Sequence, residues 1–242
     1  MPNEIVAKIS HAYKSFDKRE VLKDISIQIE TSMILGLIGP SGAGKTTTIK
    51  CLMGMEKLDQ GSTKVFDTFM PNRKILQKIG YMGQSDALYE NLTAKENLTF
   101  FGTLMGLSGN KLNQAIKENM KLVNLLDFTN QLVSTYSGGM KRRLSLCLTL
   151  LSNPDLIILD EPTVGIDPRL RLDIWKQLRF LANNKKAIII TTHVMDEAEQ
   201  CDQVGLIING KLLGLGTPQE LKYKFNANTI EEVFLKAEVR TK

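Results

Sequence analysis

The stretch Gly39-Pro40-Ser41-Gly42-Ala43-Gly44-Lys45-Thr46 fits the phosphate-binding pattern G-x-x-x-x-G-K-[ST] at every position. An apolar run at residues 33–38 precedes it, and residues 47–53 after it can start a helix. A strand, a glycine-rich loop and a helix form the structural context that this pattern needs. The stretch therefore predicts a backbone cradle in which loop N–H groups and the positive end of a helix dipole face an anion.

Two side chains of this loop carry the predicted chemistry. We expect the Lys45 ammonium to reach the β- and γ-phosphates of a nucleoside triphosphate and the Thr46 hydroxyl to bind Mg²⁺. Thr47, at the start of the helix, completes the predicted nucleotide-binding residues of this segment.

Composition narrows the class of protein. The chain has 242 residues, of which 43% are apolar and 24% are charged, which is a globular balance. No apolar run approaches the roughly 20 residues of a membrane span, and the start lacks the segments of a leader peptide, so we expect a cytosolic protein. The net charge of +5 suits a polyphosphate ligand or the cytoplasmic face of a membrane, and it argues only weakly for nucleic acid.

Cysteine and histidine usage argues against a disulfide or a zinc site. Cys51, Cys147 and Cys201 are widely spaced in apolar helical patterns, no C-x-x-C pair occurs, and the chain has two histidines. We therefore expect buried, reduced thiols.

The amino-terminal part has the alternation of an antiparallel strand pair. Residues 4–10 and 21–30 alternate apolar and polar positions, and the predicted loop between them carries Tyr13 and Phe16. An exposed aromatic ring in this loop could stack on a nucleotide base, whereas ordinary packing is the alternative.

Gln84 follows a predicted strand at residues 79–82. A short strand at 63–66 and a short basic helix at 73–78 come before it. Ligands of open α/β sheets bind beyond the carboxyl ends of strands, so Gln84 is placed to reach the ligand that Lys45 holds. A solvated surface glutamine is the alternative.

Residues 86–152 have helical patterns with no intervening strand. Thr93 and Glu96 form a capping box at the start of a helix over 94–105, and a second amphipathic helix covers about 110–126. This predicts a helical subdomain inserted into one domain that spans residues 1–242, with 1–85 and 153–242 forming the β part and the α/β core.

A second glycine-rich helix start occurs at Ser137-Gly138-Gly139. Ser137 is a good N-cap, and the glycines allow a close backbone approach. Leucines in 144–150 also alternate like a strand, but length and the following Asn153-Pro154 favour a helix. The start can face an anion, or it can be a glycine cap only.

Two adjacent carboxylates end the apolar run 156–159, which is typical of a central parallel strand. We expect Asp160 to hold Mg²⁺ and Glu161 to orient and polarise an attacking water. Solvated carboxylates at a strand end are the alternative. Another buried strand is predicted at 187–191, and His193 just after it can donate to a γ-phosphate or be a packing residue.

The remaining sequence completes an α/β pattern. An amphipathic helix covers 168–183, a hairpin around Asn209-Gly210 covers 203–215, and two short helices cover 217–225 and 230–237. We therefore predict an α/β phosphate-loop NTPase (RecA-like) core with an amino-terminal antiparallel β subdomain and the inserted helical subdomain.

The ordered set of motifs resembles the ATP-binding subunit of ABC transporters over essentially the whole chain. The set comprises Gly39–Thr46, Gln84, Ser137-Gly138-Gly139, Leu156–Glu161, Asp167 and His193. The segments LSLCLTLLSNPDLIILDEPTVGIDP and TTHVMDEAEQCDQV, and the closing Glu231-Glu232-Val233-Phe234-Leu235, resemble the exporter branch. That branch works with a separate permease and moves drugs, lipids or polysaccharides.

The resemblance implies a head-to-tail pair of subunits with two ATP molecules at the interface. One ATP would be served by Lys45, Thr46, Gln84, Asp160, Glu161 and His193, and the partner's ATP would be capped by Ser137, Gly138 and Gly139. Phe16, in Lys14-Ser15-Phe16-Asp17 before Val21-Leu22, matches the adenine-stacking aromatic, with Tyr13 as the fallback.

The same resemblance assigns partners and cofactors. It implies ATP and Mg²⁺, with Mg²⁺ near Thr46, Gln84 and Asp160, no nucleic acid, and a permease that docks near the Gln84 loop and the helical subdomain. The protein would lie on the inner face of the cell membrane through that permease, and hydrolysis would drive export.

Three positions depart from the family pattern. Tyr136 and Met140 stand where leucine and glutamine are commonest in the second glycine motif, and Gly83 stands where proline is usual before Gln84. Glu161 is present, as in hydrolysing members. The alternative function is a soluble ABC-type clamp in translation or DNA repair, but such proteins usually carry two domains or a long coiled coil, and this chain has one domain and no sustained heptads.

Overall fold

A six-stranded sheet lies at the centre of the computed structural model, which describes residues 4–239. Residues Met1–Asn3 lie outside this range. They belong to the amino-terminal segment from which we predicted that a leader peptide is absent. The strand order is β10-β9-β3-β8-β7-β6. Neighbouring strands are parallel except for the closing antiparallel pair β9–β10. The strands are β3 (Ile34–Ile38), β6 (Ile79–Met82), β7 (Leu156–Asp160), β8 (Ala187–Thr192), β9 (Gln203–Ile208) and β10 (Lys211–Gly216).

The central strands are buried on both faces, which explains their continuous apolar runs. Every residue of β3, β7 and β8 is buried. Side chains alternate between two hydrophobic cores, so that Ile34 and Ile38 belong to one core and Leu35 and Leu37 to the other. The sheet therefore separates two layers of the molecule.

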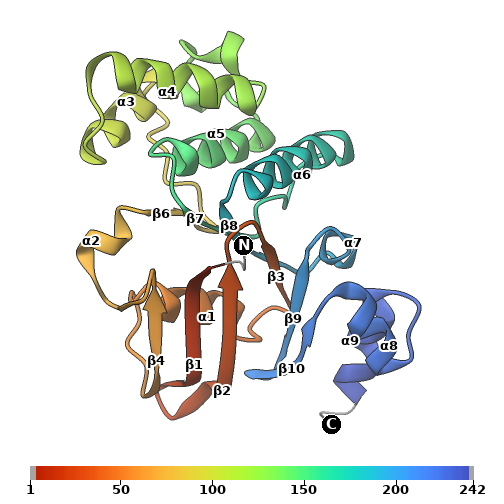
Figure 1. Cartoon of the computed structure of the whole chain (residues 1–242). Helices are drawn as coiled ribbons and strands as arrows, with labels where there is room; N and C mark the ends of the chain where they lie inside the picture. Colours follow the sequence, from red (N-terminus) through yellow and green to blue (C-terminus); the bar gives the residue numbers. More distant parts are fainter. Residues whose placement is uncertain (1–3, 240–242) are drawn as a thin grey trace.

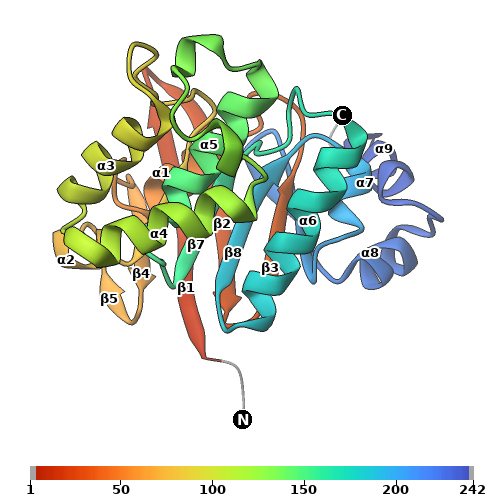
Figure 2. The same ribbon diagram turned by 90° about the horizontal axis from the view of Figure 1, so that it is seen from above.

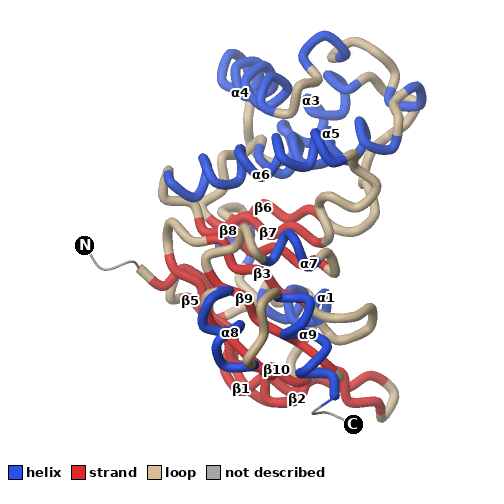
Figure 3. Tube along the Cα trace, turned by 90° about the vertical axis from the view of Figure 1, so that its right-hand side faces the viewer, coloured by secondary structure: helices blue, strands red, loops and turns tan. Residues whose placement is uncertain are grey.

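Helix α1 (Lys45–Leu52) packs in one of these layers, between the central sheet and a second sheet. Figure 3 shows α1 beside β3, with β1 and β2 beyond it. The other core contains residues of α5, α6 and the carboxy-terminal helices. These helices are α5 (Gly138–Leu150), α6 (Pro168–Asn183), α7 (Met195–Ala198), α8 (Pro218–Phe225) and α9 (Ile230–Val239).

The second sheet is antiparallel, with the order β2-β1-β4-β5. Its strands are β1 (Ile5–Phe16), β2 (Arg19–Glu30), β4 (Gln60–Val65) and β5 (Thr68–Phe69). The predicted strand pair is present, but the predicted loop is wrong, because Tyr13 and Phe16 lie in β1. Only Asp17 and Lys18 form the turn, with φ of 46° and 69°. Because a two-residue turn of this kind joins paired strands directly, β1 continues to Phe16 and β2 begins at Arg19.

The helical part lies above the central sheet in Figure 1. It contains α3 (Ala94–Leu104) and α4 (Gly109–Leu122), and α5 packs against both; the short α2 (Arg73–Leu76) precedes β6. In Figure 2, α3 and α4 lie on one side of the molecule and α8 and α9 on the other. Three α-helices, two short 3-10 helices and no strand lie between β6 and β7. The subdomain limits at residues 86 and 152 stay a prediction.

Several element ends differ from their predicted positions. Helix α4 ends at Leu122 rather than near 126, because Asn124 takes the left-handed conformation with φ of 54°. The segment 144–150 is helical, as its length indicated. The short elements β5 and α7 were not predicted, since two and four residues carry no periodicity.

Burial accounts for the cysteines. Cys51, Cys147 and Cys201 are free and buried, and desolvation raises the pKa of the Cys51 thiol to about 11. The pKa values of Cys147 and Cys201 are raised further by the same cause. Between residues 4 and 239, no helix is both long and apolar enough to cross a membrane.

Candidate functional site

The phosphate-binding loop joins the buried strand β3 to α1 and is held in close contact with two other strands. Gly44 has φ of 109°, and a Cβ there would lie 2.9 Å from the Val21 carbonyl oxygen of β2. A Cβ on Gly39 would lie 2.0 Å from the carbonyl oxygen of Ile207 in β9. Only glycine fits these positions, so the loop shape is set by the packing around it.

Lys45 is the first residue of α1 and is buried. Its Nζ donates to the carbonyl oxygens of Gly39 at 2.7 Å and Pro40 at 3.0 Å, which curls the side chain over the loop. Burial lowers the pKa of the Lys45 ammonium, and the charges of Glu161 and Asp160 oppose that shift. The ammonium therefore lies inside the loop, where phosphate oxygens would compete for its N–H groups.

Asp160 ends β7 and is fully buried. Its Oδ2 accepts a hydrogen bond of 2.9 Å from the Thr46 hydroxyl, and its Oδ1 accepts one from the Thr191 hydroxyl of the paired strand β8. Gln84 joins this cluster, because its Nε2 lies 3.4 Å from Thr46 Oγ1. The structure thus places all three predicted Mg²⁺ residues together, and their hydroxyl, carboxylate and amide oxygens are the hard ligands that Mg²⁺ prefers.

Glu161 follows directly in an unusual backbone conformation. Its φ is 53°, which costs a non-glycine residue about 1–2 kcal/mol. Its N–H donates to the carbonyl oxygen and the hydroxyl of Thr191, both at 3.1 Å. His193 Nδ1 lies 3.2 Å from Glu161 Oε1, so the two predicted catalytic side chains are neighbours at the carboxyl ends of β7 and β8.

Lys45, Thr46, Gln84 and Glu161 border a cavity of about 570 Å³, whereas Asp160 and His193 do not line it. Its lining includes Phe16, the phosphate loop, Gln84 and Glu161, whereas Tyr13 is not part of it. Phe16 is 42% exposed and carries the Lys14 ammonium 4.8 Å from its ring centroid. The cavity therefore connects an exposed aromatic ring to the phosphate loop.

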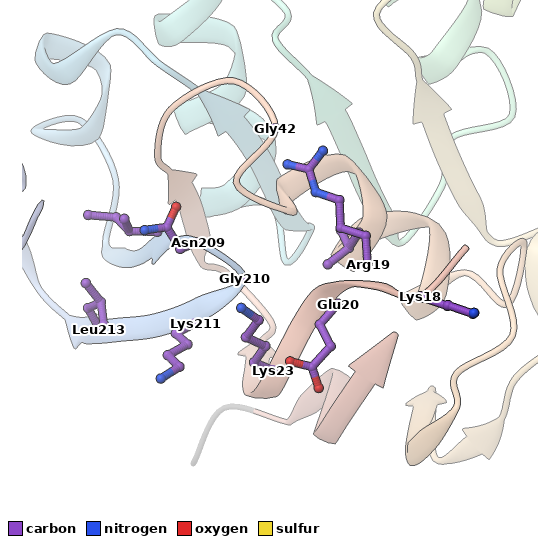
Figure 4. A pocket seen from close by; sticks show the side chains of 11 residues that line it. Lys18, Arg19, Glu20, Lys23, Gly42, Asn209, Gly210, Lys211 and Leu213 are labelled. Carbon is purple, nitrogen blue, oxygen red and sulfur yellow. The ribbon is translucent and has the colours of Figure 1, made fainter. Parts of the chain in front are cut away.

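A larger cavity of about 800 Å³ adjoins it, between the β1–β2 turn and the β9–β10 turn. Figure 4 shows the basic side chains of Lys18, Arg19, Lys23 and Lys211 around it, with Glu20 among them. None of Lys45, Asp160 or Glu161 borders this larger cavity. The larger cavity therefore lacks the residues predicted to carry the chemistry, and the smaller cavity is lined by Lys45 and Glu161 among them.

The Ser137 helix start does not border either cavity. The Ser137 hydroxyl accepts a hydrogen bond of 3.2 Å from the Met140 N–H, as expected for an N-cap. A Cβ added at Gly138 or Gly139 would meet no described atom within 4 Å beyond its chain neighbours and the backbone of its own helix. The start is thus open to its surroundings, and the structure does not bring it to the Lys45 loop of the same chain.

Comparison with known proteins decides the family. The family model described as ABC transporter matches residues 22–164. The chain belongs to the ABC transporter family. It is 35% identical over 242 residues to the probable multidrug ABC transporter ATP-binding protein YbhF of Escherichia coli, covering 97% of this chain but 42% of that protein.

Other relatives agree on the ATP-binding part. The chain is 37% identical over 220 residues to the linearmycin resistance ATP-binding protein LnrL of Bacillus subtilis, covering 90% of this chain and 71% of that protein. A solved ATP-binding subunit of an ABC transporter has a TM-score of 0.88 at 23% identity, covering 96% of this chain and 99% of that one. The α/β phosphate-loop fold and the identity as an ABC ATPase domain that binds ATP are therefore confirmed.

Three polar residues of this ABC domain that support the site were given no role by the sequence. Thr191 bonds Asp160, Arg142 is buried behind Glu161, and Glu197 is buried where it accepts hydrogen bonds from Thr192, at 2.7 Å, and from Thr163. Thr191 could have been found, because parallel strands that end in polar residues meet at one sheet edge. The sequence offers no comparable signal for Arg142 or Glu197, since charged residues are seldom fully buried.

Proposed function

We propose that this ABC domain is the ATP-hydrolysing subunit of an export system with a separate membrane permease. ATP joins two copies head to tail, and hydrolysis releases them. One observation carries the proposal: α1 and α5 both start at glycine-rich loops, and the α1 start borders the nucleotide cavity whereas the α5 start at Ser137 does not. The exposed start at Ser137 then serves the ATP of the second copy.

Each side chain of the cavity has a separate task. Lys45 and the N–H groups of the loop bind the phosphates, and Phe16 stacks on the base at the far end of the cavity. Thr46, Asp160 and Gln84 would hold Mg²⁺, which neutralises phosphate charge when it is bound. The contact between Thr46 Oγ1 and Asp160 Oδ2 supports that assignment, and Gln84 Nε2, 3.4 Å from Thr46 Oγ1, places the Gln84 amide group beside them.

Glu161 and His193 carry the chemical step. The Glu161 carboxylate orients a water and accepts its proton as the water oxygen bonds the γ-phosphorus and the bond to the ADP oxygen breaks. His193, 3.2 Å from Glu161, donates to an oxygen of the same phosphoryl group. The left-handed backbone of Glu161 turns its side chain toward the cavity rather than along the strand, and Glu161 is among the residues that border it.

An exposed apolar patch beside the Gln84 loop supports docking of a permease. Tyr89, Phe100 and Phe101 form a cluster with ring centroids 5.2–5.8 Å apart, and Tyr89, Phe100 and Leu104 are exposed. Such a patch marks an interaction surface. The permease would hold the domain at the cytoplasmic face of the membrane, and export is supported by the multidrug and linearmycin resistance names of the two relatives.

The decisive experiment uses Glu161→Gln. We expect normal ATP binding, turnover reduced by at least about 100-fold, and a dimer that persists with ATP and Mg²⁺ on size-exclusion chromatography. Asp155→Asn is the matched control, because Asp155 lies just before the opposite end of β7, where it pairs with Lys186 at 3.3 Å. A Glu161→Gln protein that stays monomeric with ATP would contradict the head-to-tail pair.

A second measurement separates export from the soluble alternative. The wild-type protein, isolated from its own cells with mild detergent, should copurify with an integral-membrane protein. Recovery only with ribosomes or DNA would instead favour a nucleotide-gated clamp.

A further inference from the structure

Arg142 is a charged residue buried inside this ABC domain, with 6% of its surface exposed. It lies on α5, which begins after the cap Ser137. A buried guanidinium needs acceptors for its N–H groups, so its partners report what it does.

One terminal nitrogen of Arg142 binds the loop that carries Gln84. Its Nη1 donates to the carbonyl oxygens of Gly83 at 2.9 Å and Gln84 at 3.1 Å, and it lies 3.3 Å from Asp86 Oδ1. Ser145, on the next turn of α5, donates to the same Asp86 oxygen at 2.7 Å. Helix α5 thus holds the Gln84 loop at three acceptors.

The other terminal nitrogen binds the end of β7. Arg142 Nη2 donates to the carbonyl oxygens of Asp160 and Glu161, each at 2.7 Å. Thr191 holds the N–H of Glu161, so the left-handed residue is fixed on both of its peptide groups. A strained backbone persists only where its surroundings hold it in this way.

We infer that Arg142 is a positioning residue for hydrolysis. It ties the backbones of Gln84 and Glu161 to the one helix that starts at Ser137, so that a shift of the Gln84 loop moves Glu161 and the helix start with it. The planar guanidinium is suited to this, because its two terminal nitrogens face two separate loops, whereas a lysine presents a single nitrogen. The inference rests on the proposed role of Glu161 in hydrolysis.

Arg142→Lys tests this inference, and Arg143→Lys is its matched control. Arg143 is the next residue of α5 and also donates to carbonyl oxygens, those of Val123 at 3.0 Å, Asn124 at 3.1 Å and Gly139 at 3.4 Å, and none of these belongs to the Gln84 loop or to the end of β7. We expect Arg142→Lys to lower kcat at least 10-fold while KM for ATP changes less than twofold. Arg143→Lys should stay within threefold of the wild type in both constants.

Amide hydrogen exchange provides a readout that does not depend on turnover. In Arg142→Lys the Glu161 amide, bonded to Thr191, should exchange at least 10-fold faster, while the amides of 121–126 keep the wild-type rate. In Arg143→Lys the two segments should respond in the opposite way. An unchanged Glu161 amide in a folded Arg142→Lys protein overturns the inference, as does a change in KM with kcat retained.

If Arg142→Lys does not fold, Asp86→Asn tests the role of Arg142 instead. This variant removes one charged acceptor of Arg142 and leaves the four carbonyl acceptors in place. We expect kcat to fall about 3-fold with KM unchanged, and an unaltered kcat overturns the inference. Absence of ATP hydrolysis by the wild type would instead contradict the proposed function, and the exchange rates would still decide the role of Arg142.

Discussion

Two helices of this ABC domain begin at glycine-rich loops, and the two starts are built in opposite ways. The start of α1 is buried, its cap Gly44 has no side chain to offer, and Lys45 bonds the carbonyl oxygens of its own loop. The start of α5 is capped by the Ser137 hydroxyl, and space remains open around Gly138.

In the proposed head-to-tail pair, this difference separates a site that one chain builds from a site that it would offer to the other. At α1 the neighbouring strands require glycine, so the residue type reports packing within the chain. At α5 no contact within residues 4–239 requires glycine at positions 138 and 139, and the proposed approach of a partner's phosphates would explain that residue type. The predictions below test that contrast.

The largest effect should come from Lys45→Ala. This change removes the buried ammonium at the phosphate loop, and charge-assisted hydrogen bonds to phosphate are among the strongest. ATP affinity, measured by equilibrium binding of a fluorescent analogue, should fall at least about 100-fold. Lys50→Ala, further along α1, should bind ATP normally. Normal hydrolysis by Lys45→Ala would show that the phosphate loop is not the nucleotide site.

Ser137→Arg should block dimer closure while ATP binding to the monomer stays intact. The long cation fills the space at the exposed helix start, and turnover should fall by tens of fold as pairing fails. Ser137→Ala is the comparison, because it removes the hydroxyl and its cap, which contributes about 1 kcal/mol to stability, without filling the space. Loss of ATP binding in Ser137→Arg would mean that Ser137 serves its own subunit.

Matched glycine substitutions sharpen the contrast further. Gly44→Ala should lower the free energy of unfolding by about 1–3 kcal/mol, since φ is 109° and the new Cβ would lie 2.9 Å from the Val21 oxygen. Gly138→Ala should unfold like the wild type but turn over ATP about 10-fold more slowly, because the partner's phosphates approach there. Thermal unfolding and turnover together decide both, and unimpaired turnover in Gly138→Ala would remove the need for an outside partner.

The smallest effect concerns the base. Phe16→Ala should weaken ATP binding by about 1–2 kcal/mol, or about 5- to 30-fold. The cause is the loss of stacking on the base at the edge of the cavity that the phosphate loop lines. Tyr13→Ala should bind ATP normally, since Tyr13 does not border that cavity. The reverse ranking, measured with the same fluorescent analogue, would make Tyr13 the stacking residue.

The sequence predicted the parts whose signals are local. The phosphate loop, the buried strands before Asp160 and His193, and the Ser137 cap each follow from a few adjacent residues, and the structure brings Lys45, Gln84, Asp160, Glu161 and His193 to one edge of the sheet. Family resemblance, rather than residue spacing, supplied the idea that Ser137 serves a second copy.

What the sequence did not predict depends on contacts between distant segments. In the sequence Arg142 is one of three consecutive cations near the start of a predicted helix, and only the fold shows that its guanidinium points inward to two other loops. The predicted strands of the β1–β2 hairpin were shorter than the observed strands. Bulges, such as the one at His11, interrupt the alternation of apolar and polar residues by which a strand is predicted. Pairing in three dimensions overrides local pattern at both places.

The strand order of the central sheet sets the time at which this domain can mature. Strand β3 carries the phosphate loop, yet its two neighbours are β8 and β9, and Ile34 pairs with Ile188. On a ribosome the loop is therefore synthesised long before the strands that flank it, and such non-local pairing forms slowly. ATP binding during synthesis would consequently report that the chain has emerged as far as β9.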